Sequence, residues 1–351
     1  MPKPQRKPAG RVTVRDVAKG AGVSVGAVSS VLSNRHVERR ISMETVENIR
    51  AVALKLGYLP NISARRLRSG TSQKHNILIA FVTSYEAPLS LASHLIYSLR
   101  QSMIGRRQDP EAMSFSLMVE MFSAGQLKDM PGLLTGDHFN AAIITNTTPE
   151  DDLFLSRAHL PFPVVLVNRA IPRYSCVVED PTVGGRAGAT LLRSKRRNLA
   201  VLHGRPITQT TAERTGNFIR SVTEQLGRPP LEIIADNLSE AAAAEAMARF
   251  LKRGDKIDGL YAVTDGMALG AYHALKGYGL EIPRDVAVVG TGDYDISGFF
   301  DPPLSVVGVE RSKLGEEACR LLLRQLEQPG VAPLKVEIPV HIILRASTER
   351  G

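Results

Sequence analysis

Small polar residues on a basic background stand at helical spacing near the start of this chain. The segment Thr13–Leu32 reads TVRDVAKGAGVSVGAVSSVL, in which two short apolar patterns are joined by a Gly-rich stretch. Ser24 opens the second pattern, and Ser29 and Ser30 follow on it. A helix of this size fits the major groove of DNA, where such side chains meet phosphates and base edges. The chemistry we expect from this segment is therefore DNA binding.

The charge of the chain supports this interpretation. Residues 1–70 hold 14 Lys+Arg and 4 Asp+Glu, whereas the formal net charge of the whole chain is +9, so the remainder is close to neutral. A local basic excess is what a nucleic-acid footprint requires. Residues 1–12 carry Pro, Lys and Arg without apolar periodicity, and we predict a disordered basic arm that adds weak attraction to phosphates.

Three helices and a hinge would position the polar residues. Thr13 and Ser24 fit N-caps for helices over 14–21 and 25–32, with Asp16 completing a capping box. A third helix should begin after Ser42, and an apolar stripe on it would close a three-helix domain over 13–59: Val46, Ile49, Ala53 and Leu56. Within the segment 60–73, Pro60 ends any preceding helix, and we expect a short hinge helix over 62–67 followed by a linker.

From residue 74 onward, short apolar runs alternate with helical patterns. The runs cover 77–82, 115–119, 141–145, 164–167, 199–202, 231–234, 259–263 and 286–290, and the helical patterns cover 89–104, 183–193, 212–226, 240–252 and 266–278. Such alternation predicts an α/β core of doubly wound parallel sheets in two subdomains. We assign the N-subdomain to about 74–168 and 305–328, and the C-subdomain to about 169–304 and 329–351. Ligands bind at the carboxyl ends of such strands, so the cleft between the subdomains is the expected small-molecule site.

Several classes of protein are disfavoured by the sequence. No apolar run is long enough to span a bilayer, and the basic start lacks the apolar stretch of a secretory signal, so a cytoplasmic location is expected. Cys176 and Cys319 suggest buried reduced thiols, and no cofactor or metal is predicted. The alternatives are a solute-binding protein of the same core fold, which the basic first domain disfavours, and an enzyme. The chain has no GxGxxG after its first strand, no P-loop, no HExxH and no GxSxG.

Three blocks of sequence resemble the lactose/galactose repressor (LacI/GalR) family of bacterial transcription factors. They are VTVRDVAKGAGVSVGAVSSVLSN, LGYLPNISARRLRSG and the late block TDGMALGAYHALKGYGLEIPRDVAVVGTGDYD, which is followed by PPLSVVGVERSKLGEEACRLLL and LRAST. The resemblance covers nearly the whole chain. It implies a helix-turn-helix domain, a hinge helix and a core similar to periplasmic sugar-binding proteins. It further implies a homodimer that binds a palindromic operator of double-stranded DNA. The regulator would be a repressor or, alternatively, an activator.

The resemblance also implies residues for DNA contact. They are Thr13, Ser24, Val25, Gly26, Ser29, Ser30, Asn34, Arg35, His36, Asn61, Ser63, Ala64 and Leu67. Ser30 stands where the family often has an arginine, and the loss of a bidentate reader of guanine would cost about 1–3 kcal/mol of discrimination. The loop cations that include Arg39 and Arg40 either contact phosphates or are solvated charges. Leu67 would be the wedge in the minor groove.

For the effector, the resemblance implies a second set of residues in the cleft. They are Ser84, Tyr85, Thr145, Asn168, Arg214, Thr264, Asp265 and Asp293. Arg214 either clamps hydroxyls or carboxylates of the ligand or is a surface arginine on its helix. Because Gly292 and Val309 replace polar positions of the family, we expect a ligand that is less hydroxylated or more anionic than a hexose, or a degenerate site. The basic run 193–197 is interpreted as charges at a helix end.

Overall fold

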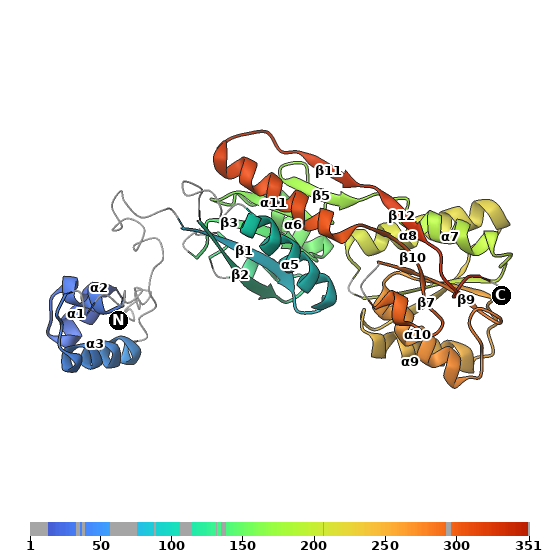
Figure 1. Cartoon of the computed structure of the whole chain (residues 1–351), viewed down its shortest axis with the longest axis horizontal. Coiled ribbons are helices and arrows are strands. Elements are labelled where there is room, and N and C mark those ends of the chain that lie inside the picture. Colours follow the sequence, from blue (N-terminus) through green and yellow to red (C-terminus); the bar gives the residue numbers. More distant parts are fainter. Residues whose placement is uncertain are drawn as a thin grey trace, which may run out of the picture. The chain divides into compact units, whose positions relative to one another are not determined.

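The computed structural model of the chain consists of two units, Met1–Gln73 and Lys74–Gly351. It describes residues 13–32, 36, 39–56, 76–87, 89–105, 114–130, 132–134, 138–205, 207–292 and 296–349. The predicted basic arm (1–12) and the predicted hinge helix (62–67) lie outside the described residues. Figure 1 labels the elements of both units.

The first unit contains three helices packed against one another. They are α1 (Val14–Ala21), α2 (Val25–Leu32) and α3 (Met43–Lys55). Their contact surface is a small apolar cluster of buried side chains: Val17, Ala18, Ala21, Val28, Val31, Val46, Ile49 and Ala53. The predicted spans of the first two helices agree with the structure. The predicted stripe of the third is wrong at Leu56, which lies just past the end of α3 and is 39% exposed.

Local capping sets the ends of α1 and the start of α2. The side chains and backbone of Thr13 and Asp16 bond reciprocally in a capping box at the start of α1. Gly22 ends this helix with a left-handed conformation, φ 65°. The Ser24 hydroxyl accepts a hydrogen bond from the backbone N–H of Ala27 at 3.1 Å, so Ser24 caps α2 as predicted. The turn between the helices is therefore fixed by contacts within a few residues of each other.

The second unit contains two six-stranded sheets within the described residues. The first has the strand order β11-β5-β4-β3-β1-β2, and all its described pairings are parallel. Its strands are β1 (Asn76–Ser84), β2 (Ser114–Phe122), β3 (Ala141–Thr145), β4 (Val164–Val167), β5 (Ser175–Glu179) and β11 (Lys335–Ile338). Residues of β3, β4 and β5 are buried throughout, as strands covered on both faces must be.

The second sheet has the order β12-β10-β9-β8-β6-β7, in which only β12 runs antiparallel among the described pairings. Its strands are β6 (Leu199–Gly204), β7 (Leu231–Ala235), β8 (Gly259–Ala262), β9 (Ala287–Thr291), β10 (Ser305–Val309) and β12 (Val340–Ile343). The two sheets confirm the predicted α/β class with doubly wound parallel sheets.

Helices cover the faces of both sheets. Those of the first sheet are α5 (Leu89–Gly105), α6 (Pro149–Arg157) and α11 (Arg311–Glu327), and those of the second are α7 (Val183–Arg193), α8 (Gln209–Leu226), α9 (Glu240–Lys252) and α10 (Asp265–Gly277). Short 3-10 turns lie at η2 (Leu127–Asp129) and η3 (Ser297–Phe299). The closest helix contacts are at glycines: a Cβ on Gly184 of α7 would lie 1.9 Å from the carbonyl oxygen of Arg214 in α8.

The predicted subdomain boundaries require a correction. β5 pairs with β4, so residues 175–179 belong to the first half and not to the second. β10 pairs with β9 and β12, so residues 305–309 belong to the second half. The C-terminal segment serves both, because β11 pairs with β5 and β12 with β10. The error arose because strand partnership depends on contacts between residues far apart in the chain, which apolar patterning cannot report.

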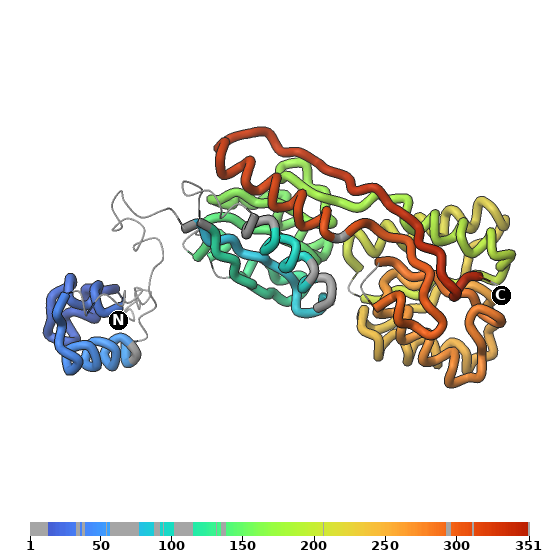
Figure 2. The backbone as a smooth tube through the Cα atoms, in the orientation of Figure 1, coloured from blue at the N-terminus to red at the C-terminus, as the bar shows by residue number. Residues whose placement is uncertain are grey.

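The described chain therefore passes between the two halves three times. It does so between Glu179 and Val183, between Val309 and Arg311, and between Ile338 and Val340. These three links lie side by side, because the Asp180 N–H donates to the Ile338 carbonyl at 3.0 Å and Val309 pairs with Val340; Figure 2 traces the backbone where the halves meet. Short connections of this kind let the halves rotate about one narrow region. Cys176 and Cys319 are both buried and outside any disulfide, as predicted, and burial raises the pKa of the Cys176 thiol.

Within the described residues, every helix is too short or too polar to cross a membrane.

Candidate functional site

The exposed start of α2 is the part of the first unit that is suited to contact DNA. Ser24, Val25 and Gly26 are exposed, while Val28 and Val31 on the opposite side anchor the helix in the core. The backbone N–H groups at a helix start favour a phosphate there. The helix thus presents its first turn to solvent from a rigid base, which is the arrangement that groove recognition needs.

The serines of α2 differ in what they can offer to a base. Ser29 and Ser30 are half-buried. The Ser30 hydroxyl donates to the backbone carbonyl of Gly26 at 2.9 Å, within the same helix. Because the Ser30 hydroxyl proton is engaged in this bond, the side chain cannot at the same time donate to a base, as an arginine at this position would. Thr13 is committed to the cap of α1.

The loop after α2 is described only in part. His36 is half-buried, and its Nδ1 is buried without a hydrogen-bond partner among the described residues. Arg39 and Arg40 are exposed, and Arg40 has a positive φ of 50°. The predicted contacts Asn34, Arg35, Asn61, Ser63, Ala64 and Leu67 lie outside the described residues.

In the second unit, polar groups gather at the carboxyl ends of the parallel strands. Arg214 on α8 donates from Nε and Nη2 to the two carboxylate oxygens of Glu179 at 2.5 and 2.7 Å, and from Nη1 to the carbonyl of Val263 at 2.8 Å. Glu179 ends β5 and Val263 follows β8, so this one arginine joins the two halves. Its side chain is 13% exposed and that of Glu179 is 6% exposed.

A second buried arginine lies beside this pair. Arg169, which follows β4, is 1% exposed. It donates from Nε to the Thr147 hydroxyl at 2.8 Å, from Nη2 to the Thr147 carbonyl at 2.9 Å, and from Nη1 to the Thr210 hydroxyl on α8 at 3.1 Å. Desolvation lowers the pKa of Arg169 to about 10. All of these acceptors are neutral hydroxyl or carbonyl oxygens.

Further hydrogen bonds hold the start of α8 against the first half. The Thr210 hydroxyl donates to the carbonyl of Asn168 at 2.8 Å. The Ala170 N–H donates to the side-chain oxygen of Gln209 at 3.0 Å, and the Gln209 amide in turn donates to Glu213. Asn168 itself has a φ of 57°, and its side-chain oxygen is buried without a partner among the described residues.

The other residues predicted for the effector have mainly local roles. The Thr264 hydroxyl caps α10 by accepting from Met267 N at 3.1 Å, and Asp265 is buried in the first turn of that helix. Thr145 donates to the carbonyl of Val167 between neighbouring strands. Ser84 is buried, Tyr85 is 64% exposed, and Asp293 lies outside the described residues. The structure thus brings Asn168 and Arg214 into one cluster around α8.

Sequence analysis missed Glu179, Arg169, Thr147, Thr210 and Gln209. In the sequence, Glu179 is an acidic residue directly after the strand-like segment SCVV, and Arg169 is a basic residue directly after VVLVN. A charged residue at the end of a buried strand could have marked both as candidates. Neither spacing indicates the partner, because the partners lie more than twenty residues away in the chain.

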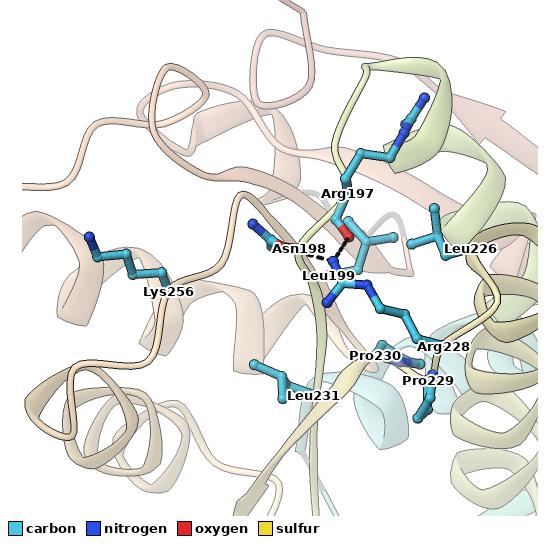
Figure 3. Close-up of a pocket in the computed structure, with 9 residues that line it drawn as sticks. All are labelled: Arg197, Asn198, Leu199, Leu226, Arg228, Pro229, Pro230, Leu231 and Lys256. Carbon is cyan, nitrogen blue, oxygen red and sulfur yellow. Dashed lines mark hydrogen bonds between the residues drawn. The ribbon is translucent and has the colours of Figure 1, made fainter.

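The basic run 193–197 is structural, as interpreted from the sequence. Arg196 is buried and donates to the carbonyls of Pro283 and Arg284. Arg197 donates to the carbonyl of Leu192 at the end of α7. Figure 3 shows the adjacent shallow pocket, in which Arg228 bonds to the backbone carbonyl of Arg197 and to Asn198, while the ends of Arg197 and Lys256 point apart. These cations do not converge on one ligand. No group of residues suited to hold a metal occurs in the described part of the chain.

Comparisons with known proteins agree with this architecture. The model for bacterial regulatory proteins of the lacI family matches residues 13–61, and the model for a periplasmic binding protein-like domain matches residues 189–348. The HTH-type transcriptional repressor PurR of Haemophilus influenzae (strain PittEE) is 26% identical over 352 residues, covering 96% of this chain and 98% of that protein. PurR of Mannheimia succiniciproducens is also 26% identical, covering 96% of this chain and 99% of that protein.

Solved structures show the same fold. The transcriptional regulator CelR–cellobiose complex has a TM-score of 0.67 and 24% identity, covering 96% of this chain and 100% of that one. The lac repressor dimer bound to operator and the anti-inducer ONPF has a TM-score of 0.69 and 23% identity, covering 97% and 99%. The capped helix-turn-helix unit is therefore a lacI-family DNA-binding domain, joined to a core that resembles periplasmic binding proteins, and a chain that combines these two domains is a DNA-binding transcriptional regulator.

Proposed function

We propose that this regulator is a repressor that binds a palindromic operator as a homodimer and changes its affinity for DNA when a small molecule enters the cleft of the core. The observation that carries the proposal is the exposed first turn of α2 on a rigid three-helix base. The curated relatives are named as repressors, which favours repression over activation. A regulator of chromosomal DNA works in the cytoplasm of a bacterium, at the nucleoid.

The proposed DNA contacts are those expected from the sequence, ranked here by the exposure of their side chains. Ser24, Val25 and Gly26 are the principal proposed contacts, because their side of α2 faces solvent. Ser29 and Ser30 come second, because both are half-buried. Thr13 completes the set among the described residues, and Asn34, Arg35, His36, Asn61, Ser63, Ala64 and Leu67 remain proposals from the resemblance.

A dimer through the core is supported by exposed apolar side chains. Phe299 is 87% exposed and Ile296 is 44% exposed, both in the loop around η3. Leu269 on α10 is 43% exposed, one turn before Tyr272, whose ring packs against Phe300 of the same loop. Such a cluster favours burial against a second copy of the chain. For the effector we propose Ser84, Tyr85, Thr145, Asn168, Arg214, Thr264, Asp265 and Asp293, with Asn168 and Arg214 as its principal contacts.

The test is the binding of the full chain to fragmented DNA of its own genome, followed by a search of the enriched fragments for a motif. A single palindromic motif supports the proposal, and enrichment without any shared motif contradicts it. Val25→Glu should abolish enrichment, because it places a carboxylate where DNA phosphates would lie. The helix itself should still form, because an acidic residue is favourable in the first turn of a helix. Met43→Glu makes the same change at the first position of α3, where Met43 is 59% exposed, and serves as the matched control.

A further inference from the structure

The arginine expected to clamp the effector already holds a carboxylate of its own chain. Nε and Nη2 of Arg214 form two parallel hydrogen bonds with the two carboxylate oxygens of Glu179. This fork-to-carboxylate geometry is the strongest form of arginine recognition, and it is the same edge that would bind a carboxylate or phosphate of a ligand. Both side chains are almost fully buried, so the pair is little screened by solvent.

The neighbouring charges make the same region unsuited to an anion. Arg169 is enclosed by Thr147, Asn168 and Thr210, and each of its three guanidinium nitrogens donates to one or two of them. Three more carboxylates act on this arginine: Asp152, which accepts from Thr147, Glu213 on α8, and Asp151. Together with Glu179, these acidic groups outnumber the two arginines. An anionic ligand would therefore meet cations whose charge is already balanced by carboxylates of the protein.

A hydrogen-bond acceptor without a donor lies next to these charges. Asn168 is 7% exposed, and its side-chain oxygen has no partner among the described residues. Its backbone carbonyl and N–H are both engaged, by Thr210 and by Val177. A buried acceptor left unsatisfied destabilises the protein, and a ligand hydroxyl or N–H would satisfy it. The amide carries no charge, so it adds no preference for a charged ligand.

We propose that Glu179 determines the charge class of the effector: it occupies the carboxylate-binding edge of Arg214, so the cleft takes an uncharged ligand whose hydroxyl or N–H group donates to Asn168. This rests on the proposed function of the cleft as the effector site. Of the three alternatives that the sequence left open, a less hydroxylated ligand, a more anionic ligand and a degenerate site, it argues against the anionic ligand.

Chemical rescue tests the assignment without knowledge of the effector. Glu179→Ala removes the carboxylate and leaves a space beside Arg214 that acetate or propionate fits. We expect this variant to melt at a lower temperature than the wild type and to regain about 2–4 °C when acetate, at constant ionic strength, reaches roughly ten times its dissociation constant. The wild type, Glu179→Gln and the double variant Glu179→Ala/Arg214→Met should show no such saturable response.

Saturable stabilisation of the wild type by acetate, dependent on Arg214, would overturn the proposal, and so would a Glu179→Ala variant that is folded by circular dichroism yet not rescued. A second arm measures thermal stabilisation of the wild type by neutral sugars and nucleosides and by their carboxylate or phosphate counterparts. Stabilisation by a neutral member only supports the proposal, and stabilisation by the anionic member of a pair contradicts it. Failure of the proposed regulator function is detected separately, by loss of palindrome enrichment in wild-type DNA binding.

Discussion

Because the core of the first unit is small, DNA binding should be sensitive to truncation of a single buried side chain, that of Ile49. Ile49 on α3 is fully buried in a cluster of only eight buried apolar residues. Ile49→Ala should cost about 2–5 kcal/mol, from lost burial and the cavity left behind. At about 0.05–0.15 kcal/mol per residue, a three-helix unit of this length has only about 2–7 kcal/mol of stability in total. We therefore expect the variant to unfold largely in this unit.

Hydrogen exchange followed by mass spectrometry is the appropriate assay, because it reports the two units separately. Peptides from 13–56 should lose protection in Ile49→Ala, while peptides from β3 and β8 keep theirs. Binding to the enriched operator should fall in parallel. The control is Glu47→Ala, on the exposed side of the same helix, which should change neither. Wild-type protection of 13–56 together with wild-type DNA affinity in Ile49→Ala would refute the reasoning.

Three further outcomes are expected. Gly184→Ala should destabilise the core by about 1–3 kcal/mol in urea unfolding, because the new Cβ would lie 1.9 Å from the Arg214 carbonyl oxygen. The control is Gly216→Ala in α8, where a Cβ meets nothing within 4 Å, and it should be neutral or slightly stabilising. Equal effects of the two substitutions would contradict the prediction. Ser24→Ala should destabilise the first unit by about 1 kcal/mol through loss of the α2 cap, measured by the same exchange assay. Burial raises the pKa of Tyr261 to about 12, so the folded state disfavours the phenolate, and stability should fall as pH rises from about 10 to 12. Tyr261→Phe should make that slope shallower, because burial also raises the pKa of Tyr272, which contributes a slope of its own; an unchanged slope would count against the reasoning.

The sequence predicted those features that depend on near neighbours. The spans of α1 and α2 and their caps at Thr13 and Ser24 follow from bonds across three residues, which a local pattern records. Leu56 was misplaced because the stripe was extended past the last turn of α3, where the chain no longer faces the core. Helix and strand alternation likewise gave the α/β class, since each element carries its own periodicity.

The division of the core and the chemistry of its cleft could not be predicted in this way. β10 follows η3 in the chain, but its partner β12 lies more than thirty residues later. Arg214 was identified by resemblance as a clamp for a ligand, yet its partner Glu179 stands 35 residues earlier and in the other half. Only the assembled fold shows that the positive charge of Arg214 is paired with a carboxylate, which argues against the anionic ligand, one of the alternatives that the sequence left open.

The three passages of the chain between the halves also constrain how the protein can be made. β11 and β12 are edge strands of different sheets, and both come from the last residues of the chain. While the ribosome synthesises the protein, neither sheet can acquire this edge strand until residues 335–343 have emerged. During that interval β5 and β10 expose unpaired backbone, which is a template for aggregation. The two halves must therefore mature together, and a chain shortened before residue 335 would lose the edge of both sheets at once.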